Sequence, residues 1–270
     1  MSPVAAPTLP STYKCSVITE PGKPAVIEMR PLNPNPPEKH ALIKVKEYPR
    51  VPGHEIVGKI VALGPNIAPK LEIGQIVGVG YSKVTGIHID GGHAEYVTAP
   101  DTSVAVLPDD IDPAKTAPTC AAVLGHLGIQ FAAKARYRTA AISGSSAKRD
   151  LTLKVGAHDY IDSFKQDPVV GLKKLGGAKV IVVMAPDHEL IRQLVPGLGW
   201  RGTVLVVAMV LGESKIDTMT LLNNWGKMSE HTWAGGSARD WEDTVKFAQL
   251  TGVETMANKV RFRAGITFDD

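Results

Sequence analysis

The chain has 270 residues, of which 44% are hydrophobic and 21% are charged, and this suits a soluble protein with two modest domains. The formal net charge is only +3 and the Lys and Arg residues are scattered, which argues against a nucleic-acid interface or a membrane-surface patch. Two cysteines are too few for a disulfide scaffold, and neither a secretory leader nor a membrane-length apolar run is visible, so we expect a cytoplasmic protein.

Short β-type runs separated by Gly and Pro fill the region from Tyr13 to Asp101. We predict strands over residues 13–19, 25–32, 41–48, 55–64, 75–81 and 93–100. Strands and turns at this spacing are typical of a compact β barrel or sandwich.

From about Leu124 the pattern changes to helices and strands in alternation. We predict helices over 125–136, 147–156, 167–177 and 187–198, and strands over 137–143, 159–162, 179–186 and 202–209. These strands are rich in Val and Ile and do not alternate with polar residues, which predicts a parallel sheet covered on both faces. The fold class is therefore α/β, with a β-rich domain followed by a doubly wound one.

Three stretches carry a family resemblance: "YPRVPGHEIVGKIVALG" at 48–64, "VTGIHIDGGHAEYVTAP" at 84–100 and "LGHLGIQFAAK" at 124–134. They resemble the zinc-dependent alcohol dehydrogenases of the medium-chain dehydrogenase/reductase superfamily, in particular the cinnamyl- and yeast-type enzymes. The resemblance implies a GroES-like catalytic domain over 1–120, to which 254–270 return, and a Rossmann nucleotide-binding domain over 121–253. It also implies hydride transfer between a small-molecule alcohol or aldehyde and a nicotinamide cofactor.

The resemblance also implies a zinc site. His54 and Cys120 match two zinc ligands of the family, and Glu55 matches a catalytic carboxylate that lies near the metal or replaces a ligand. The family's other cysteine ligand has no counterpart, so the site would need Glu55 as third ligand, or a water. The alternative is that His54 caps a turn and Cys120 is a small core residue, as we expect for Cys15.

Four family segments are missing from this sequence, which makes the expected fold incomplete. A cysteine-containing segment is absent before Tyr48, and a four-cysteine lobe is absent after Tyr81. The first Rossmann strand and its preceding helix are missing between Cys120 and Leu124, and a helix and strand are missing near the C-terminus. These absences are either deletions or segments skipped in a gene model, and they predict marginal stability.

A dinucleotide site is expected at the start of the second domain. Gly125, His126, Leu127 and Gly128 match the last half of the family's glycine-rich turn, where backbone N–H groups and a helix dipole hold the pyrophosphate. The first glycine of that turn is missing.

The end of the next strand indicates which cofactor binds. Ser143 is followed by Gly144, Ser145, Ser146, Lys148 and Arg149, and no carboxylate occurs before Asp150. Hydroxyls and cations suit the 2′-phosphate of NADP, whereas NAD enzymes usually offer an acidic residue to the ribose. The alternative is a helix N-cap at Ser145 or Ser146 with a solvated basic first turn.

Two functions follow from these patterns. The first is an NADP- and zinc-dependent alcohol dehydrogenase or aldehyde reductase, in which a homodimer is a further expectation. The second is a non-catalytic relative that keeps the fold to bind a dinucleotide or a partner.

Overall fold

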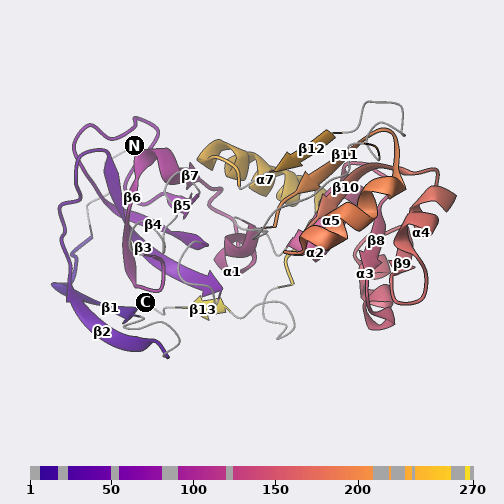
Figure 1. Cartoon of the computed structure of the whole chain (residues 1–270). Coiled ribbons are helices and arrows are strands. Elements are labelled where there is room, and N and C mark those ends of the chain that lie inside the picture. The colour runs from indigo at the N-terminus through magenta and orange to yellow at the C-terminus, as the bar shows by residue number, and fades with distance from the viewer. Residues whose placement is uncertain are drawn as a thin grey trace. The chain divides into compact units, whose positions relative to one another are not determined.

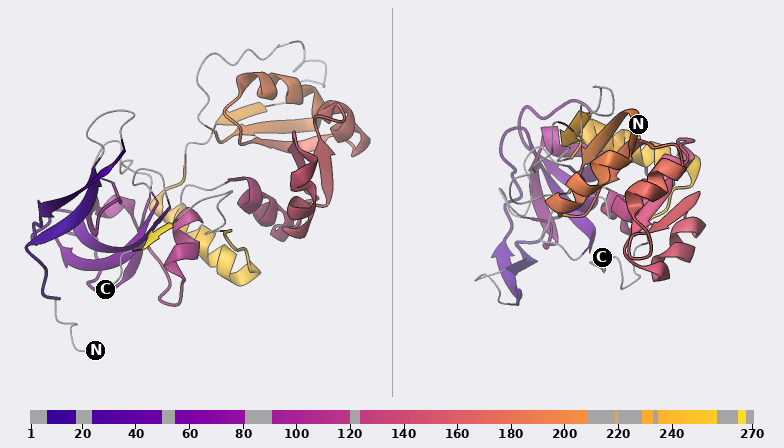
Figure 2. Two further views of the ribbon diagram at one scale, coloured as in Figure 1. Left: turned by 90° about the horizontal axis from the view of Figure 1, so that it is seen from below. Right: turned by 45° about the vertical axis from the view of Figure 1, so that its right-hand side comes forward.

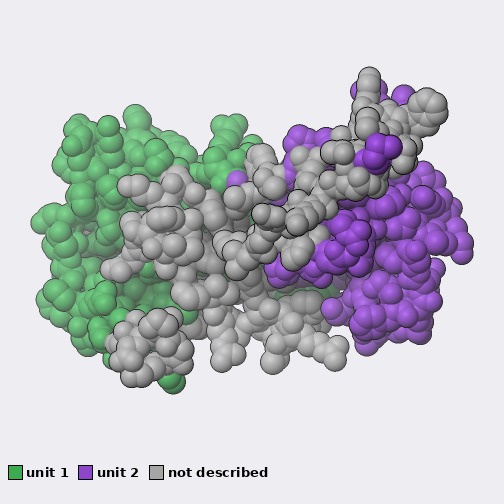
Figure 3. All heavy atoms as spheres, in the orientation of Figure 1, with its two compact units in different colours: residues 1–123, 236–270 green, residues 124–235 purple. Residues whose placement is uncertain are grey.

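The computed structural model describes residues 7–17, 24–49, 55–80, 91–119, 124–208, 219, 229–232, 235–256 and 265–267 (Figures 1 and 2). The chain divides into two compact units, coloured separately in Figure 3. Unit 1 comprises Met1–Val123 and Gly236–Asp270, and unit 2 comprises Leu124–Gly235.

An antiparallel sheet of six strands forms the centre of unit 1. Its strands are β3 (His40–Pro49), β4 (Ile56–Leu63), β5 (Ile76–Val79), β6 (Tyr96–Pro100), β7 (Val104–Val106) and β13 (Gly265–Thr267). The order is β13-β3-β4-β5-β7, and β6 also pairs with β3. A separate antiparallel pair is made by β1 (Thr12–Val17) and β2 (Val26–Pro31). The predicted β-rich domain is confirmed.

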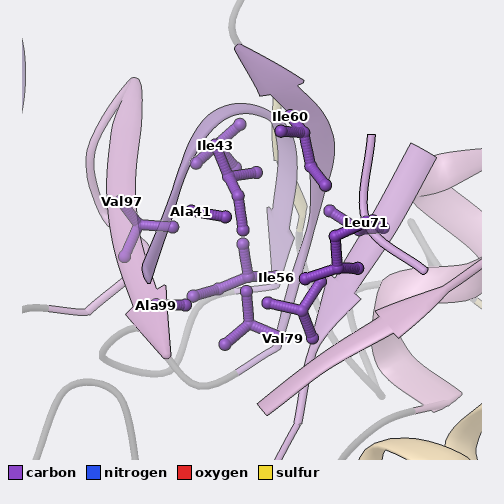
Figure 4. Packing of buried hydrophobic residues seen from close by; sticks show 11 residues of the cluster. Ala41, Ile43, Ile56, Ile60, Leu71, Val79, Val97 and Ala99 are labelled. Atoms are coloured by element: carbon purple, nitrogen blue, oxygen red, sulfur yellow. The ribbon is translucent and has the colours of Figure 1, made fainter. Parts of the chain in front are cut away.

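The core of unit 1 follows from residues that alternate along β3. Ala41, Ile43 and Val45 belong to the main apolar cluster, and Figure 4 shows Ala41 and Ile43 together with side chains from β4, β5 and β6. Leu42 points to the other face, where it packs in a smaller cluster with Tyr96. Because side chains on both faces of β3 are buried, the strand is a rigid support for a site at one of its ends. Cys15 on β1 is 6% exposed, as expected for a core residue.

Short helical segments complete the first part of unit 1. They are η1 (Asp101–Ser103), α1 (Pro113–Thr116) and η2 (Ala117–Thr119). Helix α1 contacts β3 and β4, and η2 contacts β3. The chain therefore passes close to the β3–β4 hairpin just before it leaves unit 1.

Helix α7 (Ala238–Thr251) returns to unit 1. Ser237 and Asp240 form a capping box at its start, with the Asp240 carboxylate accepting from the Ser237 backbone N–H at 2.7 Å. Trp241 and Val245 are buried in a cluster with residues of β4 and β7. The sequence analysis placed residues 236–253 in the second domain. The structure assigns them to unit 1, because the apolar face of α7 packs there.

Unit 2 alternates helices and parallel strands, as the sequence predicts. Its helices are α2 (Leu124–Lys134), η3 (Ser146–Lys148), α3 (Arg149–Lys154), α4 (Pro168–Lys174), α5 (His188–Leu194) and η4 (Val195–Gly197). Its strands are β8 (Ala140–Ser143), β9 (Asp159–Asp162), β10 (Ala178–Val183), β11 (Leu198–Val206) and β12 (Ser229–Thr232). Strand β11 begins four residues earlier than expected. Gly177 and Gly199 approach so closely that a Cβ on Gly177 would lie 2.6 Å from the Cα of Gly199, and this allows Ala178 to pair with Leu198.

The strands of unit 2 form two sheets in the described part of the chain. One contains β8 and β9, and the other has the order β10-β11-β12. A single apolar cluster joins them, because Ile161 of β9 lies in it with Ile181 and Val183 of β10, and Ile142 of β8 packs against it. The two sheets thus share one core, to which α4 and α5 also contribute. None of the helices that the structure describes is long and apolar enough to cross a bilayer.

Candidate functional site

Glu55, the described residue of the predicted metal site, lies at one end of the β3–β4 hairpin. Glu55 immediately precedes β4 and is only 3% exposed. His54 and Cys120 lie outside the described residues, directly before Glu55 and directly after Thr119. Among the described residues, no three His, Cys, Asp or Glu side chains gather around one point.

Contacts of η2 show how the chain reaches this hairpin. The Thr119 hydroxyl donates to the backbone carbonyl of Thr116 at 2.6 Å and accepts from the Trp241 indole N–H at 2.9 Å. Helix η2 contacts β3, the strand that leads into the hairpin. The residue before Cys120 is therefore anchored on the same sheet as Glu55.

The side chains expected at this site offer donor atoms of the types that zinc binds. A buried carboxylate follows an imidazole in the sequence, and a thiol follows an anchored residue in the same unit. Zinc accepts thiolate, imidazole and carboxylate ligands together. His54, Cys120 and Glu55 are the residues that would hold it.

The predicted glycine-rich turn lies within the first turns of α2. Among the described residues, no atom outside the backbone of α2 and the two adjoining residues lies within 4 Å of the position that a Cβ on Gly125 would take, so the space beside this glycine is open there. At Gly128 a Cβ would lie 2.6 Å from the Cε atom of Met184. The glycines therefore differ, with open space at the first and close packing at the second.

The two residues between these glycines are buried. Leu127 is 1% exposed, which indicates a core role and not contact with a ligand. His126 is 7% exposed, and burial lowers the pKa of its imidazole below the ordinary value. The ring is therefore neutral at pH 7 and brings no charge to a pyrophosphate.

The predicted cofactor loop follows the carboxyl end of β8, as the sequence indicates. Ser143 ends the strand, and Ser145 caps η3, with its Oγ accepting from the backbone N–H of Ala147 at 3.3 Å. Lys148 and Arg149 are exposed. Arg149 lies 3.5 Å from the carboxylate of Asp150, whose side chain is 95% exposed. The N-cap alternative is confirmed for Ser145, and it leaves both cations at the surface.

A carboxylate that the sequence analysis did not single out lies beside this loop. Asp162 ends β9, and its Oδ2 accepts a hydrogen bond from the Ser146 hydroxyl. This bond holds the pKa of Asp162 below its ordinary value, and the backbone N–H of Phe164 and the charge of Lys165 act in the same direction. The loop therefore carries a fixed negative charge from the neighbouring strand.

Two domain families match the chain. Residues 27–109 match the alcohol dehydrogenase GroES-like domain, and residues 123–249 match the zinc-binding dehydrogenase domain. Alcohol dehydrogenase patD of Penicillium expansum is 33% identical over 342 residues, covering 97% of this chain and 99% of the relative. The chain belongs to the zinc-type alcohol dehydrogenase family. The family resemblance predicted from the sequence is thereby confirmed.

A further relative and a solved structure also match along nearly the whole chain. Alcohol dehydrogenase notN of Aspergillus sp. (strain MF297-2) is 31% identical and covers 97% of this chain and 100% of its own. The crystal structure of benzyl alcohol dehydrogenase from Acinetobacter calcoaceticus superposes with a TM-score of 0.76 at 17% identity, covering 90% of each chain. The GroES-like and Rossmann-type folds are therefore those of a medium-chain alcohol dehydrogenase.

The chain is nevertheless shorter than these relatives. The match to the Penicillium protein extends over 342 residues, whereas 97% of 270 residues is about 262. About 80 positions of that match thus have no counterpart in this chain. This shortfall agrees in direction with the four family segments that are missing from the sequence.

Proposed function

We propose that the protein is an NADP-dependent oxidoreductase that interconverts small alcohols with aldehydes or ketones. In this reaction the alcohol carbon gives a hydride to NADP⁺, its hydroxyl releases a proton, and the carbonyl compound leaves. The observation that carries the proposal is family membership over nearly the whole chain. The exposed cations beside β8 support the choice of cofactor.

The proposed zinc site lies in unit 1. Zinc held by His54, Cys120 and Glu55 would polarise the substrate oxygen and favour loss of the hydroxyl proton. Glu55 would bring a carboxylate that is kept from water, since its residue is 3% exposed. The Trp241–Thr119 hydrogen bond would keep the approach to Cys120 in place.

The proposed cofactor site lies in unit 2. The open space at Gly125 would let a pyrophosphate approach the first turn of α2, where backbone N–H groups are available. Lys148 and Arg149 would meet the 2′-phosphate through charge-assisted hydrogen bonds. Carboxyl ends of parallel strands are where doubly wound folds bind nucleotides, and the loop follows such an end.

The zinc site predicts a measurable metal content. Protein purified without chelators should contain about one zinc per chain, the stoichiometry of a catalytic site with three protein ligands. His54→Ala should lose most of this metal, because a carboxylate and a thiolate alone leave the ion short of ligands. Metal analysis by mass spectrometry measures both. Cys15→Ala is the matched control, since Cys15 is a core residue, and equal zinc loss in that variant would contradict the assignment.

The cofactor loop predicts a preference for NADPH over NADH. Replacing Lys148 and Arg149 together by Gln should weaken NADPH binding by about tenfold or more, because each charged hydrogen bond contributes about 1.5–3 kcal/mol. NADH, which lacks the 2′-phosphate, should bind almost as before. Fluorescence titration of the reduced cofactors gives both dissociation constants. Equal affinity of the native protein for the two cofactors would refute the preference.

A second function is favoured by the missing segments. A chain that lacks about 80 positions of its relatives could retain dinucleotide binding without turnover. The two functions separate when NADPH oxidation is followed with benzaldehyde and with a short aliphatic aldehyde. Binding of NADPH without any turnover, in protein that contains zinc, would favour the non-catalytic function.

A further inference from the structure

Three side chains on β9 or just after it hold three successive residues of the cofactor loop. The Tyr160 hydroxyl donates to the backbone carbonyl of Ser145, and Asp162 accepts from the Ser146 hydroxyl. The ring of Phe164 lies against Gly144, where a Cβ would come within 3.0 Å of it. The conformation of the loop is therefore set by β9 as much as by β8.

This arrangement commits the Ser146 hydroxyl to a carboxylate. A phosphate that used Ser146 would have to take the hydroxyl proton away from Asp162 and then lie close to its negative charge. The backbone N–H of Phe164 also donates to Asp162, at 3.1 Å, which keeps the carboxylate in place. The 2′-phosphate of NADP would thus meet Lys148 and Arg149 on one side and a fixed anion on the other.

We propose that Asp162 is a specificity-determining residue that opposes the 2′-phosphate and limits the preference for NADP. This proposal rests on the proposed function, because it concerns the choice between two nicotinamide cofactors at the same loop. The acidic group belongs to β9, the strand next to the one that carries the loop, and its hydrogen bond with Ser146 keeps it beside the loop. Loss of its charge favours the phosphate-bearing cofactor and leaves NAD nearly unaffected.

The expected size of the effect follows from Coulomb's law. Two like charges a few ångströms apart repel each other, and they do so more strongly near a protein surface than in bulk water. A phosphate monoester carries about 1.5–2 negative charges at pH 7, but solvent and salt screen an exposed site. We therefore expect Asp162→Asn to tighten binding of the 2′-phosphate by on the order of tenfold, the change that corresponds to about 1.4 kcal/mol.

The test uses half-cofactors on the full chain. Adenosine 2′,5′-bisphosphate carries the 2′-phosphate and 5′-AMP does not, and neither reaches the nicotinamide or zinc site. Calorimetric titration gives the dissociation constants of both for the native protein and for Asp162→Asn. Asn keeps the size of the side chain: its single oxygen can still accept from the backbone N–H of Phe164, and its amide N–H can donate to the Ser146 hydroxyl, which then accepts, so the loop stays held.

Asp159→Asn is the matched control. Asp159 begins the same strand, lies about 10 Å from Asp162 at the strand rise per residue, and pairs with Arg138 at 2.9 Å. The Asp159→Asn substitution removes the same unit of net charge and does not touch the loop. Ser146→Ala is a second variant, which keeps the Asp162 charge and should not tighten binding of the bisphosphate.

The outcomes are distinct. We expect the bisphosphate to bind about tenfold more tightly to Asp162→Asn, and to no other variant, while the affinity for 5′-AMP changes less than about twofold. The gain in bisphosphate affinity of Asp162→Asn over the native protein should become smaller as salt is raised, because salt screens charge repulsion. A change shared with Asp159→Asn, a change that is equal for both nucleotides, or no change would overturn the role of Asp162. If the native protein binds neither nucleotide, the proposed function fails, and the role of Asp162 fails with it.

Discussion

Insertion of one β-strand between Val123 and Leu124 is expected to raise the melting temperature of the protein. Strands β8 and β9 pair with each other, and β10, β11 and β12 form a second sheet. We infer that they correspond to the second and third places and to the last three places of the doubly wound order 3-2-1-4-5-6. The first strand belongs between β8 and β10. Within the described residues these two strands pair only with β9 and β11, so each has an open edge toward that place.

Apolar side chains on one face of β10 are exposed. Val180 and Val182 are 49% and 43% exposed, although Ile181 and Val183 on the opposite face are buried. A strand of a parallel sheet normally has both faces covered. Five β-branched residues followed by a glycine turn would pair with both edges, whereas the face that carries these valines needs a helix to cover it.

The size of the gain can be estimated. A few added backbone hydrogen bonds at about 1 kcal/mol each give roughly 3 kcal/mol, which raises the melting temperature by about 6–12 °C for a chain near this size. Without the insertion we expect a melting temperature below about 60 °C, within the usual mesophile range. Circular dichroism during heating measures both variants.

A control insertion separates pairing from chain length. An equally long Gly-Ser segment at the same place adds a flexible loop and should leave the melting temperature unchanged or slightly lower. If the two insertions behave alike, or if the native chain already melts above 60 °C, the place between β8 and β10 does not limit stability.

Local signals explain why most elements could be predicted. Helices α4 and α5 begin where Asp167 and Asp187 accept hydrogen bonds from the backbone N–H groups that follow, and the sequence places both starts at these aspartates. The Val- and Ile-rich runs form β10 and β11 as predicted, because the preference for a strand also depends on a few neighbouring residues.

The sequence analysis assigned no helix to residues 238–251, although a local signal was present. Ser237 and Asp240 have the spacing of a capping box, and Gly252, with φ of 70°, closes the helix in the left-handed conformation. That helix α7 belongs to unit 1 could not be predicted from such a local signal. It depends on contact with strands more than 130 positions earlier in the chain, which no local pattern encodes.

The candidate site shows the same division. Ser145 as N-cap and the exposed cations Lys148 and Arg149 are local features and were predicted. The bond between Ser146 and Asp162 joins residues 16 positions apart, and it requires the parallel register in which Ser143 pairs with Asp162. Cofactor specificity that arises between strands therefore becomes visible only in the fold.

Trp241→Ala is expected to destabilise unit 1 by about 3–5 kcal/mol, the usual cost of removing a large buried aromatic side chain. Trp241 is 5% exposed, and its ring lies over Gly78 of β5 so closely that a Cβ there would come within 2.0 Å of it. It also donates to Thr119 at 2.9 Å, which links α7 to the segment before Cys120.

Trp241→Phe separates the two roles of this side chain. Phe keeps most of the apolar surface over Gly78 but loses the indole N–H, so a cost of about 1–2 kcal/mol is expected from the lost hydrogen bond and the smaller ring. Urea unfolding followed by circular dichroism measures both variants, and Leu250→Ala, at a site that is 86% exposed, is the matched control on the same helix. A loss below about 1 kcal/mol for Trp241→Ala would contradict the packing of α7 on unit 1, because a buried ring of this size contributes more than that wherever it fills a core.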